Sequence, residues 1–401
     1  MTSAESSSGS SPGGGPGALA SATLLGAATM TIMAGATIAP SLPAMAEHFG
    51  AGTELRVRLL VTITALAIAI AAPVAGFLGD RVGRVPVLFV SVALYVAAGG
   101  AGLVLSDLLA LQISRVVLGF AVAGVMTSVS ALIGDLYEGP ARDRMLGFQG
   151  AAMGFGGVVF LGLGGLLAGI SWRGPFAIYL LPLVLLALIP LALGRARSGS
   201  SEPDSAAGNA SPLPIGTLAL ICTAAFIGMI GFYAVPVQLP FLLTERGNSA
   251  PAFSGAMMAG MTLVSAVTGL AYGWVARMVP LRGLAVMAFA SIAIGLGLIW
   301  LGSGTTYPGL AGLGFGMGLL MPTLSRWLLS VTPPMARGRV MGALTTAIFA
   351  GQFASPLILA PVIANSGLAS GFLAASVLAL FVAILLAATR PATTTTGRPA
   401  T

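Results

Sequence analysis

The sequence predicts an all-helical integral membrane protein with twelve transmembrane helices in two pseudo-symmetric six-helix bundles. Hydrophobic residues make up 57% of the 401 residues and charged residues only 7%, whereas a soluble protein is nearer half apolar and a quarter charged. Apolar runs of about twenty residues, the length that crosses a bilayer, follow one another along the chain. Similar short patterns also recur half a chain apart, as expected for duplicated six-helix halves.

The apolar runs and the polar stretches between them set the expected boundaries. Residues 1–17 are rich in Ser, Gly and Pro and predict a disordered tail. The polar stretch 195–212 predicts a flexible cytoplasmic linker between an N-terminal bundle (18–194) and a C-terminal bundle (213–389), and residues 390–401 form a cytoplasmic tail. The expected spans are 18–46, 58–79, 85–106, 108–134, 144–168, 173–194, 213–240, 250–275, 282–302, 306–330, 338–363 and 368–389.

One internal repeat supports the division into halves. The pattern Arg142-Asp-Arg144-Met-Leu-Gly147 returns as Arg337-Gly-Arg339-Val-Met-Gly342, 195 positions later. The same pattern at the same place in both halves favours duplication over chance.

The distribution of arginines predicts the orientation. With both termini in the cytoplasm, thirteen arginines lie inside and four outside, a bias that follows the positive-inside rule. The four outside are Arg56, Arg58, Arg173 and Arg246. The chain contains no lysine and is rich in Ala, Gly and Arg, which is typical of a GC-rich bacterial genome. The expected location is therefore the bacterial cytoplasmic (inner) membrane.

A cluster of charges separates the second and third apolar runs. The stretch from Gly76 to Leu88 reads G-F-L-G-D-R-V-G-R-V-P-V-L, and its glycines allow close approach and sharp turns. It predicts a tight, charged turn between two membrane helices. The residues that carry this pattern are Gly76, Gly79, Asp80, Arg81, Gly83 and Arg84.

This stretch resembles motif A of the major facilitator superfamily. Gly76, Leu78, Asp80, Arg81, Gly83, Arg84 and Leu88 match in register, whereas Val85 stands where a second basic residue is usual. The resemblance implies a conformational gate on the cytoplasmic side, with Asp80 paired with Arg144 or lying against the start of the eleventh helix.

Three further stretches resemble the drug:proton antiporter branch of that family. Arg115, followed by glycines at 119 and 124, resembles motif B. The fifth span resembles motif C, although Phe160-Leu161 replace its Gly-Pro pair. The stretch 171–176 resembles the entry to the sixth helix of bacterial drug and sugar exporters. The resemblance implies export coupled to protons by alternating access.

Arg115 is the one charge expected inside a span. A charge at the bilayer centre costs about 2.5–3.5 kcal/mol, so it normally faces a cavity or a partner. Arg115 is expected either to attract an anionic or strongly polar substrate group or to tune a nearby proton acceptor; the alternative is an arginine that reaches the outer surface. All eleven acidic residues lie at span ends or in loops, which favours a neutral or anionic substrate.

The candidate substrate cavity consists of polar, aromatic and methionine side chains at mid-span depth, because such groups adapt to varied apolar ligands. They are Met30, Met33, Gln149, Met153, Phe232, Tyr233, Met317, Met321, Phe349 and Gln352. Gln352 is the strongest candidate, since a buried amide needs partners.

Composition also predicts what the protein lacks. Cys222 is the single cysteine and His48 the single histidine, so disulfides and a histidine-based metal site are excluded. No cofactor is expected, and no nucleic acid, because the arginines are dispersed between apolar runs. A membrane enzyme would need His, Asp or Ser clustered at one depth, and the sequence shows no such cluster, so an enzyme is not expected.

The expected function is export of a small amphipathic molecule, and the expected partners are this substrate, protons and the lipid bilayer, with the protein a monomer. The alternatives are a sugar or metabolite permease of the same fold and a non-transporting membrane receptor.

Overall fold

The computed structural model describes residues 17–194, 215–302 and 304–388, and these ranges are helical with short connections. The prediction of an all-helical membrane fold is confirmed. The predicted tails and linker, at 1–17, 195–212 and 390–401, lie almost wholly outside the described residues.

The first half of the chain forms six membrane-crossing units. The first is broken, because α1 (Ala18–Ala36) is followed by a 3-10 turn (Ala39–Ser41) and α2 (Leu42–Phe49), with Pro40 and Pro43 unable to donate backbone hydrogen bonds. The others are α3 (Glu54–Val82), α4 (Arg84–Gly100) with its 3-10 extension (Ala101–Leu103), α5 (Leu108–Leu136), α6 (Gly139–Ala168), and a 3-10 segment (Gly174–Leu180) followed by α7 (Leu183–Leu193).

The second half forms six long helices. They are α8 (Ile215–Glu245), α9 (Pro251–Met278), α10 (Leu281–Leu301), α11 (Thr306–Ser330), α12 (Arg337–Ser366) and α13 (Leu368–Ala388). Eleven of the twelve units in the described ranges are long and apolar enough to cross a membrane. The remaining one, α11, is a 25-residue helix whose many glycines lower its mean hydropathy.

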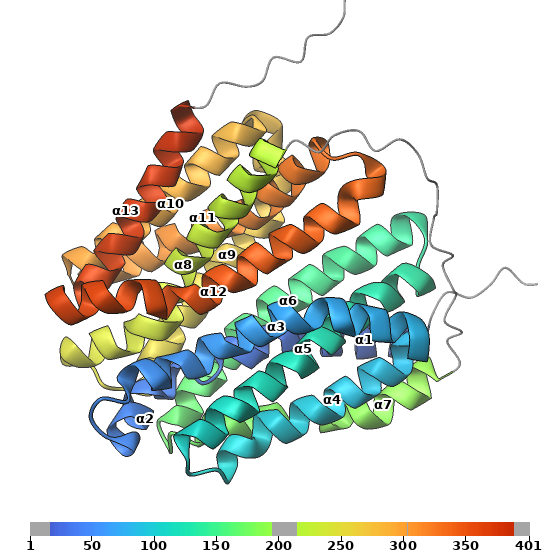
Figure 1. The fold of residues 1–401 in the computed structure, drawn as a ribbon, viewed down its shortest axis with the longest axis horizontal. Helices are drawn as coiled ribbons and strands as arrows, with labels where there is room; N and C mark the ends of the chain where they lie inside the picture. Colours follow the sequence, from blue (N-terminus) through green and yellow to red (C-terminus); the bar gives the residue numbers. More distant parts are fainter. Residues whose placement is uncertain (1–16, 195–214, 303, 389–401) are drawn as a thin grey trace, which may run out of the picture.

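The helices run alternately between two ends of the molecule. We call the end where α7 finishes and α8 begins the linker side, and the opposite end the far side. The two halves meet along two helix pairs, α6 with α9 and α3 with α12; Figure 1 shows α12 and α3 next to each other in the middle of the molecule.

The contact between the halves is tight on the far side. A Cβ added at Gly165 of α6 would lie 2.9 Å from the Cα of Gly255 in α9. Small residues at such a crossing let two backbones approach closely.

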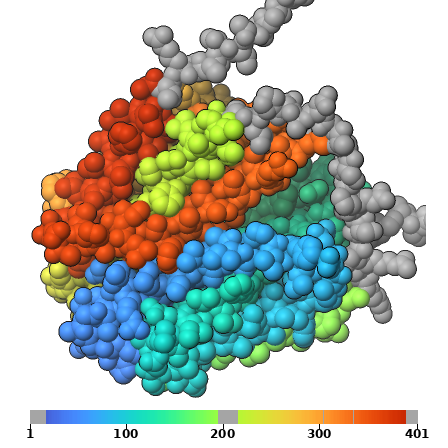
Figure 2. All heavy atoms as spheres, viewed as in Figure 1, coloured from blue at the N-terminus to red at the C-terminus, as the bar shows by residue number. Residues whose placement is uncertain are grey.

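The same helices separate toward the linker side. A Cβ added at Gly147 or Gly150 of α6, or at Gly338 or Gly342 of α12, would meet nothing within 4 Å. Figure 2 shows α12 and α3 in contact at their far-side ends and parting toward the linker side, where α6 is visible between them. The structure is therefore closed on the far side and open on the linker side.

The stretch from Gly76 to Leu88 differs from the predicted turn. Helix α3 continues through Asp80 and Arg81 to Val82, and α4 begins at Arg84. Only Gly83 lies between the helices; its φ of 102° is a left-handed conformation that suits glycine, and its N–H caps α3 by donating to the carbonyl of Gly79. The predicted tight turn is present but shorter than expected, because a single glycine is enough to reverse the chain.

Candidate substrate cavity

A cavity of about 320 Å³ lies between the two bundles, and we call it the central cavity. Helices α1, α3, α5 and α6 supply one wall, and α8, α9 and α12 supply the other. Among the described residues, those that line it carry no charge. They are Thr31, Ile32, Ala34, Gly35, Ala36, Val61, Thr64, Ala65, Ile68, Met126, Met153, Gly154, Leu161, Phe232, Tyr233, Pro236, Met258, Met261, Thr262, Ser265, Ala266, Phe349 and Gln352.

The two walls differ in chemistry. The wall from the first bundle is mostly small and aliphatic, with two methionines, Met126 and Met153. The wall from the second bundle holds the aromatic rings and the larger polar groups. Tyr233 reaches across the cavity, because a Cβ added at Gly35 of α1 would lie 3.2 Å from its hydroxyl oxygen. A bound molecule therefore meets apolar surface on one side and hydrogen-bonding groups on the other.

Gln352 supplies the most versatile polar group of this cavity. Its Nε2 donates to the sulfur of Met229 at 3.7 Å, and thioether sulfur is a weak acceptor. The residue as a whole is 9% exposed and lines the cavity, so its amide can form hydrogen bonds with a molecule bound there. A ligand donor or acceptor would satisfy it better than the sulfur does.

The structure brings together five of the ten predicted cavity residues. Met153, Phe232, Tyr233, Phe349 and Gln352 line the central cavity.

The other five lie elsewhere. Met30 and Met33 are buried within the first bundle and Met317 within the second, while Gln149 and Met321 are half-buried and do not line the cavity. Their depth in the membrane was evident from sequence, but the face of the helix that each occupies was not.

Sequence reasoning missed the methionines of α9. Met258 and Met261 line the cavity within the run M-M-A-G-M at 257–261. This concentration of soft side chains in one span was the available signal.

Arg115 does not line the central cavity in this conformation. Its side chain is fully buried inside the first bundle, where Nη2 donates to the carbonyls of Ala98 and Gly99 at 2.9 Å each. The guanidinium carbon lies 5.0 Å from the ring centroids of both Phe176 and Tyr179. These contacts join α5 to α4 and to the segment before α7.

Two tyrosines extend this buried cluster to α1. The hydroxyl of Tyr95 donates to the carbonyl of Met30, and that of Tyr179 donates to the carbonyl of Ala34, both at 2.9 Å. The two rings lie 5.8 Å apart. Arg115 therefore belongs to a cluster that holds the backbone of α1, whose neighbouring residues line the cavity.

The charges of the motif A stretch form a different set of contacts from those expected. Arg84 pairs closely with Asp135 at the end of α5 and donates to the carbonyl of Ala131 at 3.0 Å. Asp80 is 75% exposed and lies 3.9 Å from Arg84. Among the described residues its ion pair is with Arg84, and the expected pair with Arg144 does not form in this conformation.

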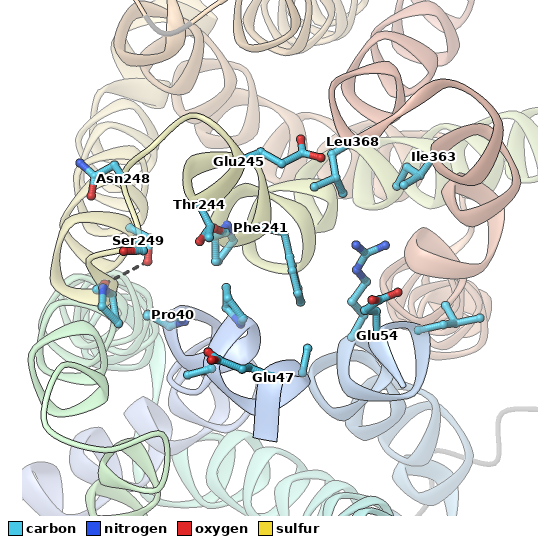
Figure 3. Close-up of a pocket in the computed structure, with 18 of the residues that line it drawn as sticks. Pro40, Glu47, Glu54, Phe241, Thr244, Glu245, Asn248, Ser249, Ile363 and Leu368 are labelled. Carbon is cyan, nitrogen blue, oxygen red and sulfur yellow. Dashed lines mark hydrogen bonds between the residues drawn. The ribbon is translucent and has the colours of Figure 1, made fainter. Parts of the chain in front are cut away.

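A second, larger space opens on the far side, and we call it the vestibule. It has a volume of about 1110 Å³ and includes three carboxylates, Glu47, Glu54 and Glu245. Figure 3 shows Glu47 and Glu54 on one side of the vestibule, Glu245 on the other and the ring of Phe241 between them. Arg58 of α3 also lines it, with its guanidinium carbon 4.6 Å from the centroid of the Phe241 ring.

Two six-helix bundles around a central cavity are the architecture of a membrane transporter. A sequence model of the Major Facilitator Superfamily matches residues 24–356, so the chain belongs to this family.

Curated relatives and solved structures agree with this assignment. The quinolone resistance protein NorA of Staphylococcus aureus is 29% identical over 140 residues, which cover 35% of this chain and 36% of NorA. Multidrug resistance protein 1 of Bacillus subtilis is 33% identical over 122 residues, covering 29% of this chain and 30% of that protein. The match thus spans about a third of each curated relative.

Among solved structures, a bacterial homologue of the human lysosomal transporter Spinster, in an inward-facing and occupied conformation, superimposes with a TM-score of 0.77. Its sequence is 15% identical, and the match covers 91% of this chain and 95% of that one. At this identity the similarity concerns the fold.

Proposed function

We propose that the protein exports small, neutral, amphipathic compounds in exchange for protons. The observation that carries this proposal is the uncharged central cavity, which has methionines on both walls, mainly small and aliphatic side chains on one wall and the aromatic rings and the amide on the other. Burying an unpaired charge in such a site is costly, which disfavours cationic and anionic substrates alike. Arg115, the one group that favoured anions, lies outside this cavity.

Export of drug-like compounds is supported by the relatives. Two of them are named for quinolone resistance and multidrug resistance. Cavities of 300–1,000 Å³ lined mainly by apolar groups suit drug-sized ligands. A sugar would instead need many hydrogen-bonding groups, and the cavity offers few.

Coupling to protons is the part of the proposal that rests on the resemblance to the antiporter branch. Because the described cavity lining contains no carboxylate, the proton must bind elsewhere on the protein.

Transport in proteoliposomes tests both parts. The probes are N-phenyl-1-naphthylamine, a neutral fluorescent amphiphile, and ethidium, a permanent cation of similar size. We expect an imposed pH gradient to drive movement of the neutral probe, collapse of the gradient with nigericin to stop it, and ethidium to move at the rate of protein-free liposomes. Ethidium movement at the same rate as the neutral probe would contradict the proposed substrate class, and movement that is insensitive to nigericin would contradict proton coupling.

Gln352→Leu provides a residue-level test of the cavity. Loss of one neutral hydrogen bond is worth about 1 kcal/mol, so the apparent affinity for a probe with a hydrogen-bonding group should fall about fivefold. The matched control is Gln149→Leu, which removes an amide from a residue outside the central cavity and should leave the affinity unchanged. Equal effects of the two substitutions on the apparent affinity would show that Gln352 does not contact the bound probe.

A further inference from the structure

The vestibule and the central cavity lie end to end along the same helices. On α3, Glu54, Leu55 and Arg58 line the vestibule, and Val61 and Ala65 line the central cavity. These positions recur every three or four residues, so they form one face of the helix.

Helix α8 shows the same succession. Glu245, Thr244 and Phe241 line the vestibule, whereas Pro236 and Tyr233 line the central cavity. The two spaces are therefore consecutive parts of one path between the bundles, and the path is interrupted where the lining changes from one set of residues to the other.

Arg58 and Phe241 stand at this interruption, one from each bundle. The guanidinium carbon lies 4.6 Å from the ring centroid, within the range of a cation–π interaction. Arg58 is only 8% exposed, and its Nε has no hydrogen-bond partner among the described residues. A nearly buried guanidinium with an unpaired nitrogen is costly to hold, so its position calls for an explanation beyond packing.

The charges around Arg58 also come from both bundles. The carboxylates that act on it are Glu54, one turn earlier on α3, and Glu245, one turn beyond Phe241 on α8. When the bundles part on the far side, Arg58 keeps Glu54 but loses both Phe241 and Glu245. The attraction of Arg58 to α8 is thus present only in the conformation that is closed on this side.

We propose that Arg58 and Phe241 form the far-side gate of the transport path, with Glu245 as the electrostatic partner that favours its closed state. The gate separates the central cavity from the vestibule while the linker side is open. This proposal rests on transport by alternating access and is independent of the substrate and of proton coupling.

Access of a thiol reagent to the central cavity tests the gate directly. The reporter is Ala65→Cys in a Cys222→Ser background, since Ala65 lines the central cavity next to the gate. The protein is reconstituted in liposomes and treated from outside with a membrane-impermeant maleimide. The exposed residues Ala51 on the far side and Ser330 on the linker side, each replaced by Cys, report which side of the protein faces the reagent.

We expect slow labelling of the reporter from the far side, and an increase of about tenfold when Arg58→Ala or Phe241→Leu opens the gate, because a desolvated cation–π pair accounts for about one power of ten in an equilibrium. Glu245→Gln should give a smaller increase. The matched control is Arg56→Ala, which removes an exposed arginine two residues earlier on the same helix and should not change labelling.

Two results would overturn the proposal. Labelling of the Arg58→Ala and Phe241→Leu variants at the unsubstituted rate, in protein that elutes as a single folded species, would show that this pair does not close the path. An equal increase in Arg56→Ala would show a general effect of charge. The labelling needs no substrate and no gradient, so its outcome is independent of whether the neutral probe is transported.

Discussion

The two ends of α6 lie in opposite environments although they belong to one continuous helix. On the far side, Gly164 packs against Thr37 at the end of α1, and Gly165 packs against α9. On the linker side, the turns around Gly147 and Gly150 face open space. Helix α12 also differs along its length, since Gly351 near its middle packs against the backbone of α8 in the same bundle while Gly338 and Gly342 meet nothing.

This difference shows where the present conformation gains its stability. Close packing of small residues joins α6 to α9 at one end, whereas the glycines of α6 and α12 at the other end face free space. The exposed linker-side glycines are suited to the opposite conformation, in which those ends would come together. The comparison predicts that substitutions on the far side change the stability of this structure, while substitutions on the linker side change its ability to switch.

One of the two largest expected effects is at Arg115. Arg115→Ala would empty a fully buried site and leave the carbonyls of Ala98 and Gly99 without their donor, so the free energy of unfolding should fall by about 3 kcal/mol. Thermal unfolding in detergent measures the change, with Arg144→Ala, at an exposed arginine of α6, as the control. If probe binding fell while stability stayed the same, Arg115 would act on the substrate after all.

The next largest effect on stability is expected at Gly165, and Gly147 of the same helix provides the comparison. In Gly165→Ala the new Cβ would lie 2.9 Å from the carbonyl oxygen of Pro251, and forcing atoms into such a contact costs about 1–3 kcal/mol. In Gly147→Ala the new methyl meets nothing, so the higher helix propensity of alanine should stabilise the protein by up to about 1 kcal/mol. Thermal unfolding of the two variants should therefore shift in opposite directions, and shifts of the same sign would contradict the comparison.

The smallest expected effect on stability is at Asp80. Its pair with Arg84 is long and solvent-exposed, and such pairs contribute about 0–1 kcal/mol. We therefore expect Asp80→Asn to unfold close to the unsubstituted temperature but to transport at least tenfold more slowly, if the gating role implied by motif A operates in the opposite conformation. Asp135→Asn is the contrasting variant. It removes the close, largely buried partner of Arg84, so it should destabilise the folded protein by about 3 kcal/mol.

Equal stability losses in Asp80→Asn and Asp135→Asn would show that Asp80 is already paired in this structure.

The sequence was sufficient to predict the fold, because membrane-spanning helices leave a strong pattern of long apolar runs. Each span needs about twenty apolar residues, and the expected spans agree with the observed helices to within a few residues. The first span was an exception. Its length was predicted, but the break in the helix after Ala36 was not, although Pro40 and Pro43 indicate such a break in the sequence.

The site was harder to predict, because a membrane helix is apolar on nearly all of its faces. The spacing of polar and apolar residues then does not show which face of a helix points into the cavity. Met30 and Met153 therefore look alike in sequence, although only Met153 lines the cavity. Arg115 was recognised as unusual, but its partners are backbone carbonyls and aromatic rings, which carry no sequence pattern. Arg58 was counted only as an outside charge, since its contact with Phe241 joins residues 183 positions apart.

The two tyrosine hydroxyls that donate to the carbonyls of Met30 and Ala34 restrict how α1 can move relative to its neighbours. They attach two successive turns of α1 to α4 and to the segment before α7, so α1 cannot bend without breaking a buried hydrogen bond. We therefore expect α1, α4 and the segment before α7 to move together as one rigid unit.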